Sequence, residues 1–205
     1  MKGGNSMSAP TDTTPRSQAK ADRRSALLSA AATLFARSGF NRVSIEDLGA
    51  AVGVSGPAVY RHFNGKQAVL AALLIDVSED LVAGGRAVLT ETADATAALR
   101  DLVRFHVRFA LTNPDVIRVQ DRDLDSLAES DRHRVRALQR EYVELWVQVL
   151  QRVHPSVDVA LLRIRAHATF GLLNSTPHSA RASSTASVRA LLEEMALAAL
   201  GATAA

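Results

Sequence analysis

The sequence predicts an all-α protein of nine to ten helices, with a small helix-turn-helix module at its start and a larger helical domain behind it. Every periodic apolar stretch of the 205 residues has the three-to-four-residue spacing of an amphipathic helix, and none alternates as a strand does. Alanine, leucine, valine and arginine dominate, whereas aromatic residues make up only 4%. No cysteine is present, which excludes disulfides and thiolate zinc sites.

The first helices follow from local signals. Residues 1–16 are rich in Ser, Thr, Pro and Gly and are expected to form a disordered tail. A helix is expected over Ser17–Ser38, ended by Gly39 at its C-terminus. Ser44, followed three residues later by Asp47, resembles a capping box and predicts a second, short helix.

A tight turn is expected after this short helix. Gly53 adopts a positive φ at little cost, so it ends the second helix and begins the turn. Gly49, four residues earlier, leaves room for two short helices to cross closely. Ser55 is expected to cap a third helix that ends near Phe63. The spacing therefore predicts a helix-turn-helix.

Longer helices are expected from residue 64 onward. Asn64 is expected to cap a helix whose end is weakened by Gly84–Gly85. A capping box at Ser126 and Glu129 is expected to open a long helix that ends before His154. The other helices are expected over residues 94–111, 114–120, 157–173 and 187–200, with a loop over residues 174–187.

Charge is distributed unevenly along the chain. Residues 1–66 carry nine Lys or Arg against four Asp or Glu, whereas residues 67–205 carry fifteen Arg and seventeen acidic residues. A basic module joined to a nearly neutral domain indicates that the first part contacts a polyanion. No apolar run reaches the ~18 residues needed to cross a membrane, and the N-terminus lacks a secretory signal. We therefore expect a cytoplasmic protein without a membrane partner.

The segment "VSIEDLGAAVGVSGPAVYRHFNGKQAVLAAL" resembles the DNA-binding signature of the tetracycline-repressor (TetR) family. The resemblance covers roughly residues 20–75, and beyond them it is one of architecture only. Gly49 and Val52 stand where the family usually has alanine, and both keep the packing small or apolar. The resemblance implies a DNA-binding domain over residues 17–66 and an effector-binding and dimerisation domain over residues 67–205.

The resemblance also implies which residues contact DNA. They are Arg23, Ser44, Ser55, Gly56, Pro57, Tyr60, Arg61, His62 and Lys66. Arg61 is expected to contact a base edge, Tyr60 and His62 the backbone, and Lys66 a phosphate. Arg16, Lys20 and Arg24 are further candidates for the backbone or the adjacent minor groove. The alternatives are a packing role for Tyr60 and a solvated one for Arg61.

In the second domain the resemblance implies a homodimer and a ligand pocket. The last two helices carry apolar faces suited to a two-fold dimer interface, the alternative being packing on their own chain. Candidate pocket residues are Phe105, His106, Phe109, Tyr142, Trp146, His167 and Phe170. The effector is expected to be apolar or, because Arg100, Arg104 and Arg108 recur on one face, acyl-coenzyme A-like. The alternatives for these side chains are core packing and a solvated charged row.

The function implied is a sequence-specific DNA-binding transcriptional regulator, most often a repressor released from a palindromic operator by a small-molecule effector. No catalytic residue, cofactor or metal site is expected. The alternatives are a helical enzyme or a DNA-architectural protein without effector control. The first would need a phosphate-binding Gly-rich loop or a metal-binding pair, which are absent from the sequence. The second would need a basic charge throughout the chain.

Overall fold

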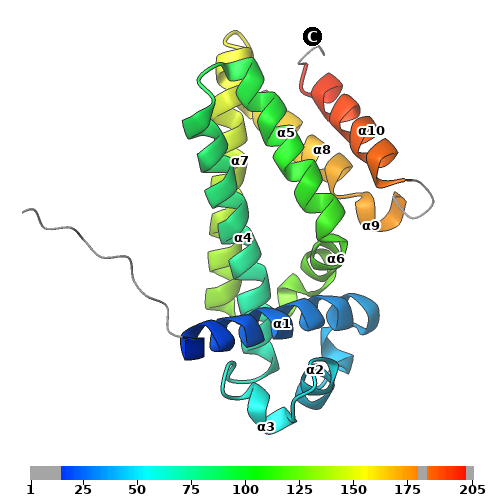
Figure 1. Ribbon diagram of the computed structural model, residues 1–205. Helices are drawn as coiled ribbons and strands as arrows, with labels where there is room; N and C mark the ends of the chain where they lie inside the picture. The colour runs from blue at the N-terminus through cyan, green and yellow to red at the C-terminus, as the bar shows by residue number, and fades with distance from the viewer. Residues whose placement is uncertain (1–14, 180–183, 202–205) are drawn as a thin grey trace, which may run out of the picture.

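The computed structural model describes residues 15–179 and 184–201, and within these ranges the regular elements are all helical (Figure 1). The all-α expectation is confirmed. The tail expected over residues 1–16 lies outside the described ranges except at Pro15 and Arg16, which begin the first helix. The α-helices are α1 (Pro15–Ser38), α2 (Ile45–Ala51), α3 (Gly56–Val59), α4 (Lys66–Glu91), α5 (Ala95–Thr112), α6 (Pro114–Asp123), α7 (Glu129–Val153), α8 (Val159–Leu173), α9 (Thr176–Ser179) and α10 (Thr185–Ala199), with 3₁₀ turns η1 (Phe40–Arg42) and η2 (Leu124–Ser126).

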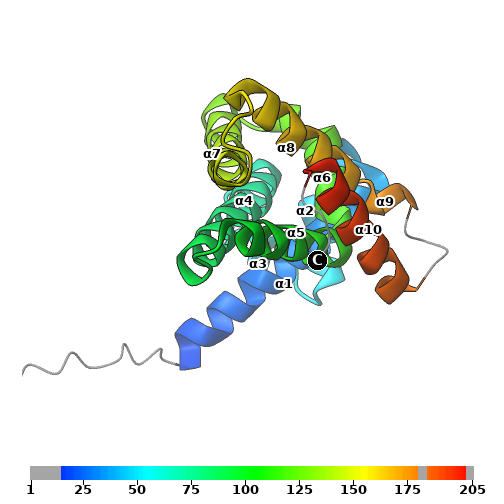
Figure 2. The same ribbon diagram turned by 90° about the horizontal axis from the view of Figure 1, so that it is seen from above.

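The helices form two packed regions. Figure 1 shows α1 lying across the foot of an upright bundle, with α2 and α3 beyond it at the end of the molecule. The long helices α4 and α7 pack side by side, and α5, α8 and α10 complete the bundle, as the view from above also shows (Figure 2). The short helices that carry the predicted DNA contacts therefore lie at one tip, far from α8 and α10.

Each region has its own apolar core. The first core gathers buried side chains of α1 to α4 with contributions from α6, η2 and α7, among them Leu27, Phe35, Leu48, Val59 and Leu70. The second core joins the later part of α4 to α5, α7, α8 and α10, among them Leu99, Leu102, Trp146, Leu162 and Ala196. Because α4 supplies buried residues to both cores, it is a continuous link between them.

Several helix ends match the local signals. Gly39 and Gly53 have φ of 85° and 70°, in the left-handed region expected at these turns. The Ser44–Asp47 capping box is complete: the Asp47 amide donates to Ser44 Oγ at 3.0 Å and the Ser44 amide to Asp47 Oδ2 at 2.9 Å. The hydrogen bonds that the Ser44 amide and hydroxyl donate to the carboxylate lower the pKa of Asp47.

Other predicted caps are wrong. Ser55 occupies the N-cap of α3 but its side chain accepts no capping hydrogen bond, and α3 ends at Val59 instead of near Phe63. The N-cap of α4 is Gly65, at φ 104°, not Asn64. Ser126 lies in η2, and the N-cap of α7 is Ala128, without a side-chain hydrogen bond. In each case backbone geometry or tertiary packing, not a capping side chain, sets the boundary.

The predicted weakening of α4 at Gly84–Gly85 is also wrong. The helix continues through both glycines to Glu91. A Cβ on Gly84 would lie only 2.1 Å from Cζ of Phe105, and one on Gly85 would lie 3.0 Å from Cε2 of Tyr142. The two glycines therefore admit aromatic rings of α5 and α7 against α4. The loop expected over residues 174–187 contains α9 and the first turn of α10.

No helix in residues 15–179 or 184–201 is both long enough and apolar enough to span a membrane.

Candidate nucleic-acid interface and ligand cavity

Helices α2 and α3 cross closely at the predicted turn. The Val54 amide donates to the Gly49 carbonyl at 2.9 Å, which closes the turn around Gly53. A Cβ on Gly49 would lie 2.7 Å from the Val54 carbonyl oxygen, so the close approach expected at this glycine is confirmed. Two short helices fixed around one glycine form the geometry that presents a helix to the major groove.

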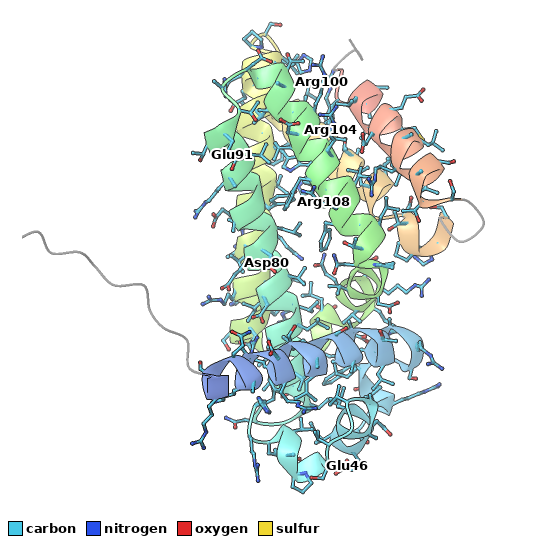
Figure 3. All side chains as sticks on the ribbon, viewed as in Figure 1. Glu46, Asp80, Glu91, Arg100, Arg104 and Arg108 are labelled. Carbon is cyan, nitrogen blue, oxygen red and sulfur yellow. The ribbon has the colours of Figure 1, made fainter. Side chains whose placement is uncertain are left out.

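The surface at α3 is mostly open. Ser55, Pro57, Tyr60 and Arg61 are exposed, and Tyr60 retains 56% of its surface, which disfavours the packing role considered for it. Gly56 differs, because it is buried and a Cβ there would lie 3.2 Å from Oε1 of Glu46, the α2 residue labelled beside α3 in Figure 3. Gly56 therefore faces α2 and presents no side chain to DNA.

Cations surround this surface, each held in a different way. Lys66 donates to the Asn41 carbonyl at 3.3 Å and lies 4.5 Å above the Phe40 ring. Arg23 donates to the carbonyl of Val52, the C-cap of α2, at 3.1 Å. Both contacts leave a positive charge at the rim while fixing where it lies.

Three further candidates are partly committed to other contacts. Arg24 pairs with Asp76 of α4 at 2.6 Å, which engages it away from the α3 surface. The Ser44 hydroxyl donates to Asp47 at 2.8 Å within the capping box. His62 is half-buried, and its Nδ1 is buried without a hydrogen-bond partner.

A separate cavity of about 200 Å³ lies between α4, α5, α6, α7 and α8. Of the predicted pocket residues, five line it: His106, Phe109, Tyr142, His167 and Phe170. Phe105 does not, because it packs on Gly84. Trp146 does not either; it is fully buried in the second core, 4.8 Å from the Phe170 ring.

Seven lining residues were not anticipated from the sequence. They are Ser78, Leu81, Gln120, Leu138, Gln139, Val143 and Asn174. The most consequential is Asn174, whose Oδ1 lies 3.1 Å from His106 Nε2. It falls in the segment predicted as a loop, so no helical periodicity pointed to it. No Asp, Glu, Lys or Arg lines the cavity.

A chain of hydrogen bonds crosses the cavity wall. His106 is buried, and burial lowers its pKa to about 4, so the imidazole is neutral near pH 7. An amide oxygen only accepts, so the Nε2–H donates to Asn174 and Nδ1 accepts from the Tyr142 hydroxyl at 3.3 Å. Burial likewise raises the pKa of Tyr142, which stays protonated. The cavity therefore combines aromatic and aliphatic side chains with an oriented chain of polar groups, and it has no Asp, Glu, Lys or Arg in its wall.

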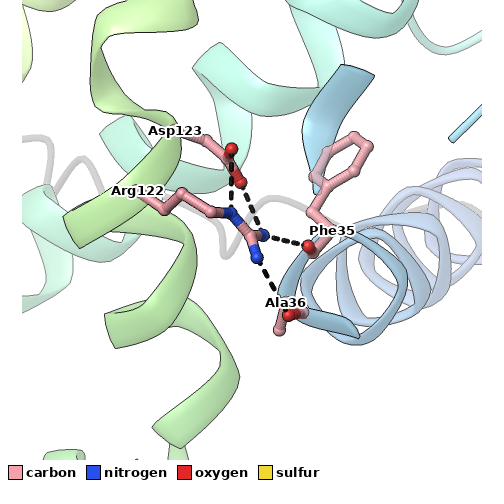
Figure 4. Close-up of polar contacts among 4 residues, drawn as sticks. All are labelled: Phe35, Ala36, Arg122 and Asp123. Carbon is pink, nitrogen blue, oxygen red and sulfur yellow. Dashed lines mark hydrogen bonds and ion pairs between the residues drawn. The ribbon is translucent and has the colours of Figure 1, made fainter. Parts of the chain in front are cut away.

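Helix α6 contacts the last turn of α1 through Arg122 (Figure 4). Arg122, near its end, donates through Nη2 to the Phe35 carbonyl and through Nη1 to the Ala36 carbonyl at 3.3 Å. The guanidinium also binds both oxygens of buried Asp123, at 3.1 and 2.9 Å. Gln120 of the same helix lines the cavity. Helix α6 thus contacts both the cavity and the last turn of α1.

An apolar face remains uncovered on α8 and α10. Its large side chains are Leu161, Ile164, Leu191 and Met195, which are 55%, 62%, 55% and 44% exposed. On these two helices Leu162, Leu192 and Ala196 face the second core instead. Each helix is therefore apolar on two sides, only one of which its own chain buries.

Comparisons with known proteins agree with this architecture. The family model for bacterial regulatory proteins of the tetR family matches residues 27–73, and that for the tetracyclin repressor-like C-terminal domain matches residues 92–200. The HTH-type transcriptional repressor KstR2 of Rhodococcus jostii is 28% identical over 133 residues, 64% of this chain and 65% of that protein. The nucleoid occlusion factor SlmA of Shewanella pealeana is 32% identical over 120 residues, 58% and 60% of the two chains.

Similarity at the level of structure extends over most of the chain. A TetR-family transcriptional regulator from Bordetella parapertussis superposes with a TM-score of 0.75 and 25% identity, covering 85% of this chain and 93% of that one. The two curated relatives are matched over less than two thirds of their own lengths. Because the C-terminal model alone spans more than half of the 205 residues and the N-terminal model covers the helix-turn-helix, the chain belongs to the tetR family of bacterial regulatory proteins.

Proposed function

We propose that this regulator is a homodimeric repressor that binds a palindromic operator and is released by a small neutral effector. The observation that carries the proposal is the separation of two sites in one chain. An exposed helix-turn-helix lies at one tip, and a cavity without Asp, Glu, Lys or Arg in its lining lies in the bundle at a distance from it. Two separate binding sites in one chain are what a protein needs if binding of a ligand at one site changes its DNA affinity at the other.

DNA recognition is assigned to the α3 surface. Arg61 follows α3 and is its long exposed cation, suited to the acceptor atoms of guanine in the major groove. Tyr60, His62 and Lys66 are assigned to the phosphate backbone, where they fix position without determining sequence. Ser55 and Pro57 flank the start of α3 and keep the approach of the helix unobstructed.

The uncovered face of α8 and α10 is assigned to a second copy of the chain. Leu161, Ile164, Leu191 and Met195 would be costly to leave in water. A two-fold axis through this face pairs each patch with itself, as an isologous interface requires. It also presents two α3 helices to two half-sites of an inverted repeat.

The effector is assigned to the cavity between α4 and α8. At about 200 Å³ the cavity is smaller than the ~300–1,000 Å³ typical of drug-sized ligands. Without a charged lining residue it has no partner for an ionised group, because burying an unpaired charge is strongly unfavourable. Of the two effector classes expected from the sequence, the small volume and the lack of Lys or Arg in the wall disfavour the acyl-coenzyme A-like one, and the lining suits a small neutral molecule that offers both apolar surface and hydrogen-bonding groups. Arg100, Arg104 and Arg108 lie along α5 outside it (Figure 3).

Selection of duplexes from a random pool, followed by binding measurements at stated salt, tests the DNA-binding part. We expect an inverted repeat to be enriched and bound at least 10³-fold more tightly than random duplex. Arg61→Ala should lose about 1–3 kcal/mol of discrimination at one position of each half-site. Lys66→Ala should weaken all duplexes alike and reduce the salt slope by about 2, since each dimer loses one phosphate contact per half-site. A monomer, or the absence of any preferred repeat, would overturn the proposal.

A further inference from the structure

Asn174 ends α8 and lines the cavity at the same time. As the C-cap of the helix, its backbone N–H donates to the Phe170 carbonyl at 2.8 Å. Its side chain belongs to the cavity wall, where Oδ1 lies 3.1 Å from His106 Nε2. Hydrogen bonds on both the backbone and the side chain therefore fix where this carboxamide lies and how it is turned.

The hydrogen bonds of the wall run in one direction. The Tyr142 hydroxyl donates to Nδ1 of His106, and Nε2–H of His106 donates to Oδ1 of Asn174. The Asn174 side chain thus turns its acceptor to His106 and is left with the two N–H donors of Nδ2. No described residue accepts a hydrogen bond from Nδ2, and this atom is not among the unpartnered side-chain atoms that are sealed from solvent. The NH₂ group is therefore free to donate to a ligand.

Two other polar groups of the wall are left with the opposite capacity. The Ser78 hydroxyl donates to the Leu74 carbonyl at 2.7 Å, so its oxygen can only accept from a ligand. The same holds for the Tyr142 hydroxyl, whose hydrogen is used on His106. The remaining polar side chains of the wall make no hydrogen bond within the described part of the chain and are free to turn: Gln120, Gln139 and His167. Asn174 is therefore the donor that the fold itself orients.

The cavity has room for about one ring. Its volume of about 200 Å³ exceeds the roughly 150 Å³ of an apolar cavity that accepts benzene. Phe109 and Phe170 line it and offer aromatic faces on which an apolar ring can pack. Since no Asp, Glu, Lys or Arg lines it, an ionised group would be buried there without a counter-charge. A neutral monocyclic compound matches this volume, and an acceptor oxygen on it matches the oriented donor.

We propose that Asn174 selects the effector by donating a hydrogen bond from Nδ2 to a carbonyl oxygen on a neutral, monocyclic molecule that packs on Phe109 and Phe170. His106 is a positioning residue in this arrangement, because its Nε2–H holds the Asn174 oxygen and so leaves the NH₂ group for the ligand. The inference rests on the proposed function, since it takes this cavity as the effector site. A site that hydrogen-bonds one group of its ligand rejects an analogue without that group, because the partner in the wall is then left unpaired.

The test compares three ring compounds of nearly equal size. Cyclohexanone only accepts hydrogen bonds, cyclohexanol accepts and donates, and methylenecyclohexane does neither. Trp146 is the one tryptophan of the chain, and its ring centroid lies 4.8 Å from that of Phe170, so its fluorescence reports binding in the cavity. Wild-type protein without DNA should bind cyclohexanone and cyclohexanol within about 3-fold of each other, and each roughly 10-fold more tightly than methylenecyclohexane.

Two variants separate the donor from the shape of the side chain. Asn174→Asp keeps the shape but replaces the NH₂ group by an oxygen that only accepts, so cyclohexanone should bind roughly 10-fold more weakly whereas cyclohexanol, which can donate, should not. General loosening of the cavity would not separate these two compounds. Asn174→Leu removes the donor and should bind all three compounds alike. Gln139→Leu is the matched control, because it removes a carboxamide from the same wall, and it should retain the wild-type order.

The outcomes distinguish this inference from the proposed function. Equal binding of cyclohexanone and methylenecyclohexane by wild type, or no separation of the ketone from the alcohol in Asn174→Asp, would overturn the inference and leave the cavity as an effector site. Loss of the wild-type order in Gln139→Leu would also overturn it, since the selection would then not belong to Asn174. Absence of binding by all three compounds would overturn the inference together with the assignment of the effector to this cavity. Selection of an operator tests the DNA-binding part independently of all three results.

Discussion

The two cores of the molecule differ in the kind of residue that they bury. The first core around Phe35 and Leu48 is apolar, and the buried polar side chain beside it is Asp123 of α6, which pairs with Arg122. The second region buries His106, Thr169 and Thr176 as well as the apolar cluster around Trp146, and it encloses a cavity. The helix-turn-helix therefore rests on an apolar core, whereas the helical bundle contains a cavity with polar groups in its wall.

This difference corresponds to the two tasks assigned to the molecule. Contacts with DNA require side chains held in fixed positions, which a close-packed apolar core provides. A ligand site requires space and oriented polar groups, and both reduce packing. The first core should therefore respond to mutation mainly through stability, and the second through the balance between stability and binding.

The largest expected effect tests that contrast with two equal truncations. Phe35→Ala removes a fully buried ring that packs edge-on against Phe40 at 5.4 Å, and should lower the free energy of unfolding by about 3–5 kcal/mol. Phe170→Ala removes a half-buried ring that already borders the cavity, and should cost less than half as much. Urea denaturation of both variants measures the difference. Equal losses would contradict the contrast between the cores.

The parts of the structure that the sequence predicted are those set by short-range signals. Ser44 and Asp47 are three residues apart and form the predicted capping box, whereas the equally spaced Ser126 and Glu129 do not, because η2 continues through Ser126. Gly53 likewise adopts its positive φ for a local reason. The helix-turn-helix was predictable because its constraints lie within about twenty residues.

The remainder depends on contacts between distant residues. From the sequence, Gly84 is predicted to weaken its helix. In the structure it instead makes room for the ring of Phe105, which belongs to another helix. Asn174 enters the cavity because it approaches His106, 68 residues earlier in the chain. Periodicity places residues on faces of helices but does not say which faces meet. Hence five of the seven predicted cavity residues line it, and the polar partner was missed.

The next effect concerns pH and the buried imidazole. His106 has a pKa of about 4 in the folded protein against 6.5 when unperturbed, so the unfolded chain binds the proton more readily. Its contribution to stability is therefore complete above pH 6.5 and is lost as the pH falls toward 4. At pH 5 the loss should be about 2 kcal/mol.

Comparison with His106→Gln isolates this contribution from that of the carboxyl groups, which titrate in both proteins. Wild type should lose more stability than the variant between pH 6.5 and 4, and denaturation at several pH values measures the difference. Parallel stability curves for the two proteins would show that His106 is not the group responsible.

A smaller effect is expected where α6 meets the first core. Arg122→Ala removes the donors to the Phe35 and Ala36 carbonyls and leaves buried Asp123 without its partner. Since the guanidinium is about half exposed, the cost should be about 1–3 kcal/mol. Arg163→Ala, which breaks the more exposed pair with Glu144, is the matched control and should cost under about 1 kcal/mol. Thermal denaturation that ranks the two variants the other way would contradict the role assigned to Arg122.

The smallest expected effect probes the hydrogen-bond chain in the cavity wall. Tyr142→Phe keeps the ring but removes the hydroxyl that donates to His106 Nδ1, at a cost of about 0.5–1.5 kcal/mol. That hydrogen bond stabilises the neutral imidazole, so its loss should raise the pKa of His106 above its value of about 4. The pKa should nevertheless stay below 6.5, because burial, the main cause of the shift, is unchanged. NMR titration of the imidazole in wild type and in Tyr142→Phe measures the two pKa values. A lower pKa in the variant than in wild type would mean that the hydroxyl accepts a hydrogen bond from His106 instead of donating one to it.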